Sequence, residues 1–125
     1  MYKLTGVMFS QEEIEAKVIE LAKQIEKDYK GQDLLLVGIL KGASVFVADL
    51  MRKIDLNVNI DFMSVSSYGS GTVSSGTVKI LKDLDVDVDY VGFVIEDKFI
   101  VGYGIDYDEK YRNLPYIAIV EDVED

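Results

Sequence analysis

The chain has 125 residues, with 23 acidic and 13 basic side chains and a net charge of −10. This length fits one compact domain with its own core, so we expect residues 1–125 to form a single domain. Cysteine and histidine are both absent, which excludes disulfides, Cys/His zinc sites, and mechanisms that use a thiolate or an imidazole. The acidic balance argues against a nucleic-acid partner, and any bound phosphate would need Mg²⁺ or local cations beside it.

The hydropathy pattern gives no sign of a membrane segment or a targeting sequence. The longest apolar run, residues 34–40, is far too short to span a bilayer and suits a buried strand. The chain also opens without a charged stretch followed by an apolar one. Because cysteine is absent as well, we expect a cytoplasmic protein with no membrane partner.

The first predicted element is a helix that begins at about Gln11. Ser10 and Glu13 have the spacing of a capping box, and Gly31 is placed to end the helix. Apolar residues recur at helical spacing between charged ones, which predicts one face packed on a sheet. They are Ile14, Val18, Leu21, Ala22 and Ile25.

A strand, a helix and a second strand are predicted next. Residues 34–40 form the first strand, Lys41 and Gly42 turn, residues 43–54 form the helix, and residues 58–65 form the second strand. This order is a βαβ unit, in which the strands pair in parallel through a right-handed crossover. We therefore expect an α/β fold with a mainly parallel sheet flanked by helices.

The remainder of the chain is predicted to hold a loop and four short strands. Residues 66–76 are rich in Ser, Gly and Thr, too polar for a core, so we expect a long loop acting as a lid or a hairpin excursion. The strand candidates are residues 77–82, 90–95, 99–103 and 116–120.

The turn at Lys41 and Gly42 is the first candidate site. It follows a buried strand and precedes a helix, so its backbone N–H groups face the sheet edge where such folds hold anions. Phosphate or pyrophosphate is the expected ligand. The alternative is an ordinary turn in which Gly42 supplies backbone freedom and Lys41 is solvated.

The second candidate lies in residues 97–107. Phe99 can stack on a planar base, and Asp106 can hold a metal through water. Arg112 follows, and its guanidinium can clamp a phosphate. In the alternative interpretation Phe99 is a core residue, Asp106 caps a turn, and Arg112 pairs with Asp108 or Glu109 at the surface.

Two acidic groups are weaker candidates. Aspartates at every second position from 83 to 89 indicate a strand with one solvated acidic edge. A calcium loop starting at Asp85 is disfavoured because Tyr90 stands where that loop needs Gly. Glu121 and Asp122 follow an apolar strand and can bind Mg²⁺ or a ribose diol, or form a solvated terminus.

Taken together and in this order, these segments closely resemble the hypoxanthine-guanine phosphoribosyltransferases, especially bacterial ones. The resemblance runs over residues 9–85 and again over residues 89–116. It implies a phosphoribosyltransferase (type I) fold, and a pyrophosphate loop whose peptide before the lysine is often cis. The implied site residues are Lys41, Gly42 and Arg112 for pyrophosphate, Ser67 and Tyr68 in the mobile catalytic loop, Phe99 and Ile100 for the purine, and Asp106 for the purine side and the metal.

The resemblance has a gap between residues 85 and 89, where such enzymes carry several dozen more residues. These residues would include a strand with an acidic pair for the ribose, an Asp general base, a Thr-Gly-x-Thr-like phosphate loop and a lysine for the purine oxygen. We therefore expect an internal deletion in an engineered or minimised enzyme, with a truncated or rearranged core. Residues 119–125 resemble the start of the absent motif, as if a strand and acidic pair stood again at the terminus.

By resemblance, the reaction is phosphoribosyl transfer from phosphoribosyl diphosphate to hypoxanthine or guanine in purine salvage, with Mg²⁺ as cofactor and pyrophosphate released. The family also implies a homo-oligomer, either a dimer or a tetramer. Because the phosphate loop and the base are missing, we expect weak or absent turnover. The alternatives are a non-catalytic α/β scaffold, a module that binds purine or pyrophosphate, and a hetero-oligomer in which another chain supplies the missing strand.

Overall fold

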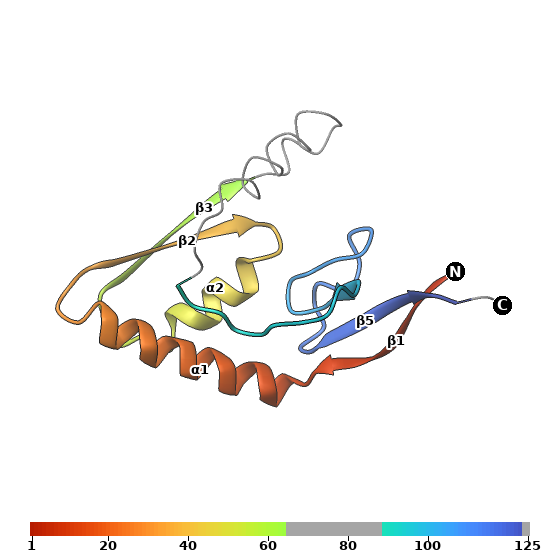
Figure 1. The fold of residues 1–125 in the computed structure, drawn as a ribbon. Coiled ribbons are helices and arrows are strands. Elements are labelled where there is room, and N and C mark those ends of the chain that lie inside the picture. Colours follow the sequence, from red (N-terminus) through yellow and green to blue (C-terminus); the bar gives the residue numbers. More distant parts are fainter. Residues whose placement is uncertain (65–88, 124–125) are drawn as a thin grey trace.

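The computed structural model of the protein describes residues 1–64 and 89–123 (Figure 1). The predicted loop at 66–76 and the predicted strand at 77–82 lie outside these residues. The described elements follow one another as β1 (Tyr2–Phe9), α1 (Gln11–Asp28), β2 (Leu34–Leu40), α2 (Ser44–Met51), β3 (Val58–Ser64), β4 (Ile100–Val101) and β5 (Ile117–Asp122). None of the described helices is long and apolar enough to cross a membrane.

The described strands form two sheets joined by helix α1. β2 and β3 pair in parallel, from Leu34 opposite Val58 to Leu40 opposite Ser64. The second sheet has the order β1-β5-β4 and is antiparallel. Figure 1 shows α1 running from the end of β1, in the second sheet, to the turn before β2, in the first. The predicted α/β class and the predicted parallel pair are confirmed, while the described antiparallel pairs are confined to the second sheet.

Helix α1 begins where the sequence predicts it to begin. The Glu13 backbone N–H donates to Ser10 Oγ at 3.1 Å, and the Ser10 N–H donates to Glu13 Oε1 at 3.0 Å. This reciprocal capping box satisfies two backbone donors that would otherwise lack partners. After the helix, Gly31 takes a positive φ of 78° and turns the chain toward β2.

The main core lies between the apolar stripe of α1 and the elements that cover it. All five predicted stripe residues are buried, and Leu34, Leu50, Ile54 and Ile117 complete the cluster. Helix α2 packs very closely on the parallel pair, because a Cβ at Gly38 would lie 2.7 Å from Val47 Cγ2. A smaller cluster of Val101, Ala118 and Val120 stabilises the second sheet.

The segment before β4 corrects the prediction of a strand over residues 90–95. No described residue from 89 to 99 belongs to a strand. The segment instead follows α1: Tyr90 Oη donates to Asp28 Oδ2 at 2.5 Å, and the Phe93 ring stacks on Phe9 with centroids 3.8 Å apart. Phe93 therefore packs between Phe9, at the end of β1, and Lys17 of α1, whereas Val91 and Val94 are exposed at 51% and 91%.

The ends of other elements also differ from the predictions. Strand β1 was not predicted, and it pairs with β5 through two irregularities near Gly6 and Phe9 that obscure a regular alternation. β4 is only two residues long because Gly102 and Tyr103 take positive φ values of 100° and 51°. Helix α2 is shorter than the predicted 43–54, and β5 extends two residues past the predicted 116–120.

Candidate anion-binding site

Two turns from separate parts of the sequence touch each other. The first turn, at Lys41 and Gly42, joins β2 to α2. The second turn, residues 102–116, joins β4 to β5. A Cβ at Gly104 would lie less than 3.0 Å from the Gly42 carbonyl oxygen, closer than real Cβ atoms approach. Gly104 also has a positive φ of 94°, which favours glycine. The two backbones therefore meet with no side chain between them.

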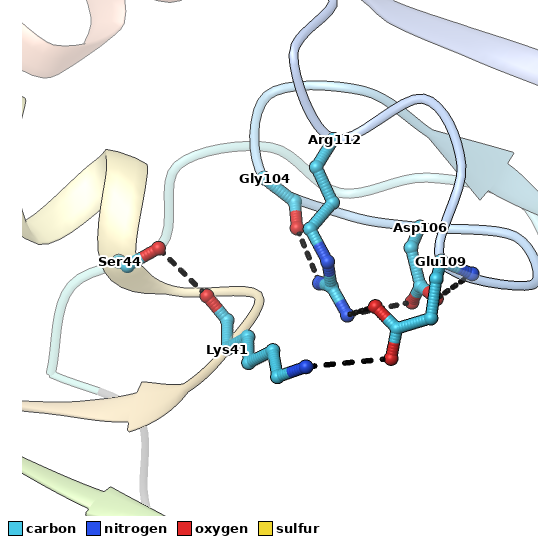
Figure 2. A network of polar contacts seen from close by, with 6 residues as sticks. All are labelled: Lys41, Ser44, Gly104, Asp106, Glu109 and Arg112. Atoms are coloured by element: carbon cyan, nitrogen blue, oxygen red, sulfur yellow. Dashed lines mark hydrogen bonds and ion pairs between the residues drawn. The ribbon is translucent and has the colours of Figure 1, made fainter.

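The Lys41 turn is fixed by local hydrogen bonds. Ser44 Oγ donates to the Lys41 carbonyl oxygen at 2.8 Å, and the Ser44 backbone N–H donates to the same oxygen at 3.0 Å. The Leu40–Lys41 peptide is cis, as the resemblance implies. These bonds hold the turn in place, so the Lys41 side chain extends toward the second turn (Figure 2).

A cavity of about 350 Å³ opens where the two turns meet. Four of the predicted site residues line it: Lys41, Gly42, Asp106 and Arg112. The other lining residues are Leu40, Ile105 and Glu109. Residues more than sixty positions apart in the sequence thus share one hollow, although their predicted roles remain predictions.

Arg112 is held by three partners. Its guanidinium donates to the Gly104 carbonyl oxygen at 2.9 Å and to Glu109 Oε2 at 3.0 Å, and it lies 3.5 Å from Asp106 Oδ1. The side chain is partly buried, and Figure 2 shows its guanidinium lying between the Gly104 carbonyl and the Glu109 carboxylate. A guanidinium fixed in this way keeps its donors in one plane for a planar or bidentate anion.

Glu109 joins the two cations of the site. Its Oε1 lies 3.5 Å from Lys41 Nζ, while its Oε2 accepts from Arg112. The hydrogen bond from Arg112, followed by the charge of Lys41, lowers the pKa of the Glu109 carboxyl. The Glu109 backbone N–H donates to Asp106 Oδ2 at 2.7 Å. The alternative interpretation of the sequence therefore holds for two residues: Asp106 caps a turn, and Arg112 pairs with Glu109.

Of the predicted purine residues, Asp106 lines this cavity, whereas Phe99 and Ile100 do not. Phe99 is 49% exposed, and its ring contacts Tyr107 edge to face with centroids 5.4 Å apart. The Tyr2 ring also contacts Tyr107, with the two ring centroids 5.3 Å apart. Ile100 pairs with Ile119 in the second sheet. Phe99 is thus half-buried and packs against other aromatic rings. One of these rings is Tyr2 of β1, a strand that the sequence analysis did not predict.

A hydrogen bond on the other side of the second turn was not predicted. Tyr103 Oη donates to Asp49 Oδ2 at 2.6 Å, and Asp49 also pairs with Arg52. Burial, followed by the bond to Asp49, raises the pKa of Tyr103 well above its usual range. A separate cavity of about 540 Å³ lies here and includes Arg112 in its lining. The bond fastens the second turn to α2 and so keeps it against the Lys41 turn.

Several candidates are not brought to this site. Ser67 and Tyr68 lie outside the described residues, as do the aspartates from 83 to 87. Glu121 accepts a hydrogen bond from Thr5, and Asp122 Oδ1 accepts from the N-terminal amine at 2.7 Å. These two carboxylates do not line the three cavities described here, which are lined by residues of the turns and helices.

The described residues contain no group of three or more acidic, His or Cys side chains placed to hold a metal. Asp106 is the one carboxylate at the cavity that the resemblance links to a metal. Mg²⁺ is commonly held by one or two carboxylates together with phosphate oxygens and water. A metal that arrives with a phosphate ligand fits this donor set, whereas a metal held by protein alone does not.

Comparisons with known proteins identify the family of the chain. Residues 8–85 match the family model described as phosphoribosyl transferase domain. A hypoxanthine-guanine phosphoribosyltransferase of Streptococcus thermophilus is 39% identical over 167 residues that cover 93% of each chain. A crystal structure of such an enzyme from Bacillus anthracis superposes with a TM-score of 0.81 at 38% identity, covering 97% of this chain and 100% of the other.

The chain is shorter than the relatives that it matches. The chain is 37% identical to the bifunctional protein TilS/HprT of Listeria monocytogenes but spans only 26% of its length. In the Streptococcus alignment, 93% of a 125-residue chain occupies 167 positions, so roughly 50 positions have no counterpart here. The family model nevertheless matches more than half of the chain, and relatives match on both sides of the gap. The chain therefore belongs to the phosphoribosyltransferase family, among its hypoxanthine-guanine members.

Proposed function

We propose that this chain binds the diphosphate of phosphoribosyl diphosphate, and free pyrophosphate, at the cavity between the two turns. The contact between Gly42 and Gly104 is the observation that supports this most, because it brings Lys41 and Arg112 to one hollow. Lys41 and Arg112 supply local positive charge in a chain of net charge −10, in a cavity that Asp106 and Glu109 also line. No other cavity described here is lined by a cation from each turn.

The reaction that we propose for this site is phosphoribosyl transfer to N9 of hypoxanthine or guanine in purine salvage. The bond from the ribose carbon to the diphosphate oxygen breaks, pyrophosphate leaves with the electron pair, and N9 of the purine forms the new bond. The imidazole N–H proton of the purine then passes to solvent, since the family's general base is among the groups that we place in the missing segment. Lys41 and Arg112 stabilise the charge that develops on the departing oxygens. Ser67 and Tyr68 belong to the loop proposed to exclude water from the reacting centre.

Asp106 is the residue proposed to hold Mg²⁺. Its carboxylate is half-buried at the cavity and accepts one backbone N–H bond from Glu109, so its position is fixed. Bound Mg²⁺ would neutralise part of the charge of the diphosphate. The purine is proposed to lie on Phe99, with the backbone of Ile100 at its edge, because half of the Phe99 side chain is exposed for stacking.

Turnover is proposed to be weak or absent. The roughly 50 positions without a counterpart are where we place the phosphate loop, the general base and the purine-contacting lysine. We propose that the chain is one domain shortened near residues 85–89, a minimised or engineered enzyme that acts in the cytoplasm. The competing candidates are a purine or pyrophosphate module without chemistry and a bare scaffold.

The test of the binding site is calorimetric titration with inorganic pyrophosphate in the presence of Mg²⁺, together with thermal melting. Pyrophosphate should raise the melting temperature, because a ligand that binds only the folded state stabilises it. Lys41→Ala combined with Arg112→Ala should abolish both signals. The matched control is Lys23→Ala, which removes an exposed cation on α1 far from the turns in sequence. Absence of any shift in the unmodified chain would favour the bare scaffold.

Catalysis is tested separately by following inosine monophosphate. The purified chain, given hypoxanthine, phosphoribosyl diphosphate and Mg²⁺, should form little or none while still binding pyrophosphate. Robust product formation would contradict the proposal that the deletion removed the catalytic groups. Product without measurable pyrophosphate binding would contradict the assignment of the cavity.

A homo-oligomer, dimer or tetramer, is also proposed. One face of the parallel pair exposes large apolar side chains: Leu35 at 58%, Val37 at 50%, Ile39 at 45% and Met63 at 60%. These residues alternate along β2 and β3 and share one face in the observed register. Light scattering should give a mass above that of one chain, and Val37→Lys should reduce it. A monomer at all concentrations would contradict this proposal.

A further inference from the structure

The carboxylate of Glu109 occupies the place between the two cations of the cavity. Its two oxygens face different partners, with Oε1 at 3.5 Å from Lys41 Nζ and Oε2 at 3.0 Å from the Arg112 guanidinium. Figure 2 shows the side chain lying between Lys41 and Arg112. Two oxygens of a bound phosphate could accept hydrogen bonds from the same two cations, so the carboxylate and a phosphate would occupy the same position.

The backbone that carries Glu109 is unusual for this residue type. Tyr107 and Lys110 form an isolated antiparallel bridge, with N–H to carbonyl bonds of 3.0 Å in both directions. Asp108 and Glu109 form the two-residue tip, with positive φ values of 55° and 62°. Such hairpin tips strongly favour Asn or Gly, because the Cβ of other residues is crowded at positive φ. An observed backbone outlier of this kind is a reason to look for function.

We propose that Glu109 is a built-in competitor of the diphosphate, and this rests on the proposed function of the cavity. In the free protein its carboxylate neutralises Lys41 and Arg112 and holds both side chains at the hollow. A diphosphate must displace that carboxylate before it reaches the two cations. Glu109 therefore lowers the affinity for every anion, and only a ligand of higher charge than a carboxylate displaces it readily.

The lowered pKa of the Glu109 carboxyl agrees with this arrangement, because both cations favour its charged form. Its side chain is exposed, so the competing contacts are weak individually. Solvent and salt screen exposed ion pairs, so each contributes only weakly. Removing the negative charge should therefore raise the affinity for pyrophosphate by about three- to tenfold.

The experiment compares Glu109→Gln with the unmodified chain by calorimetric titration with inorganic pyrophosphate and Mg²⁺. Glu109→Gln keeps the length of the side chain and the backbone N–H that donates to Asp106. Asp108→Asn is the matched control, since it removes one negative charge from the adjacent tip position. Asp108 is exposed, has no ion pair among the described residues, and Asn tolerates a positive φ. We expect a three- to tenfold lower Kd for Glu109→Gln and less than a twofold change for Asp108→Asn.

Each other outcome overturns the inference in a recognisable way. Equal gains for the two variants would mean that only the net charge matters. A weaker affinity for Glu109→Gln would mean that Glu109 supports the ligand rather than competing with it. Unchanged affinity in Glu109→Gln, with binding still lost in Lys41→Ala plus Arg112→Ala, would refute the competitor and leave the proposed function standing. If no form of the chain binds pyrophosphate, the proposed function fails and the competitor fails with it.

Discussion

The contact between Gly42 and Gly104 can be tested by adding one methyl group. In Gly104→Ala the new Cβ would overlap the Gly42 carbonyl oxygen, and the residue would also keep a φ of 94°. The backbone conformation costs about 1–2 kcal/mol for a residue with a Cβ. The overlap with a backbone atom, which cannot rotate away, adds about 1–3 kcal/mol as in overpacked cores. The free energy of unfolding should therefore fall by about 2–5 kcal/mol.

Gly31→Ala isolates the contact from the backbone cost. Gly31 has a similar positive φ of 78°, but a Cβ there would meet nothing within 4 Å. This control should lose about 1–2 kcal/mol, which lowers the melting temperature by roughly 3–8 °C in a chain of this size. Circular dichroism during heating gives both values. Equal melting temperatures for the two variants would show that the turns do not touch, and the shared cavity would have no structural basis.

Two further predictions concern the elements that hold the turns in place. Ser10→Ala removes half of the capping box of α1 and should lower the free energy of unfolding by about 1 kcal/mol in urea titrations. Tyr103→Phe should cost about 1 kcal/mol at neutral pH, where the bond to Asp49 is intact but half exposed. Because the fold raises the pKa of Tyr103 above its value of 10.0 in the unfolded chain, this contribution is complete below pH 10 and is lost as the pH rises through the folded value. The difference in unfolding free energy between the unmodified chain and Tyr103→Phe should therefore shrink in alkaline solution. A difference that stays constant with pH would show that folding does not change the pKa of Tyr103.

Local patterns predicted most of the first half of the chain. The capping box at Ser10 and the stripe that includes Ile14 and Val18 are short-range signals, and they placed α1 correctly. The run of residues 34–40 likewise became the parallel strand β2. These signals succeed because the residues that decide the element lie within a few turns of one another.

Partners distant in sequence account for what the patterns missed. β1 is a strand because β5 lies beside it more than a hundred residues later, and its irregular pairing hides the alternation. The segment at 90–95 has the composition of a strand, but it is held by Phe93 stacking on Phe9 and by Tyr90 bonding to Asp28, and none of the described strands pairs with it. The bond from Tyr103 to Asp49 and the bridging position of Glu109 also have no local signature, since each depends on how the second turn meets α2 or β2.

The arrangement of the two sheets explains why we propose that an anion site is retained while the catalytic site is lost. The Lys41 turn is built by β2, α2 and their own hydrogen bonds, and the second turn is built by β4, β5 and the bonds of Arg112. Neither turn uses a residue from the segment that relatives carry and this chain lacks. What joins them is the contact at Gly42 and the bond from Tyr103 to α2, both of which depend only on residues present here. Among residues 1–64 and 89–123, the cavity lining holds no substitute for the groups that we place in the missing segment, so we expect loss of turnover with retention of anion binding.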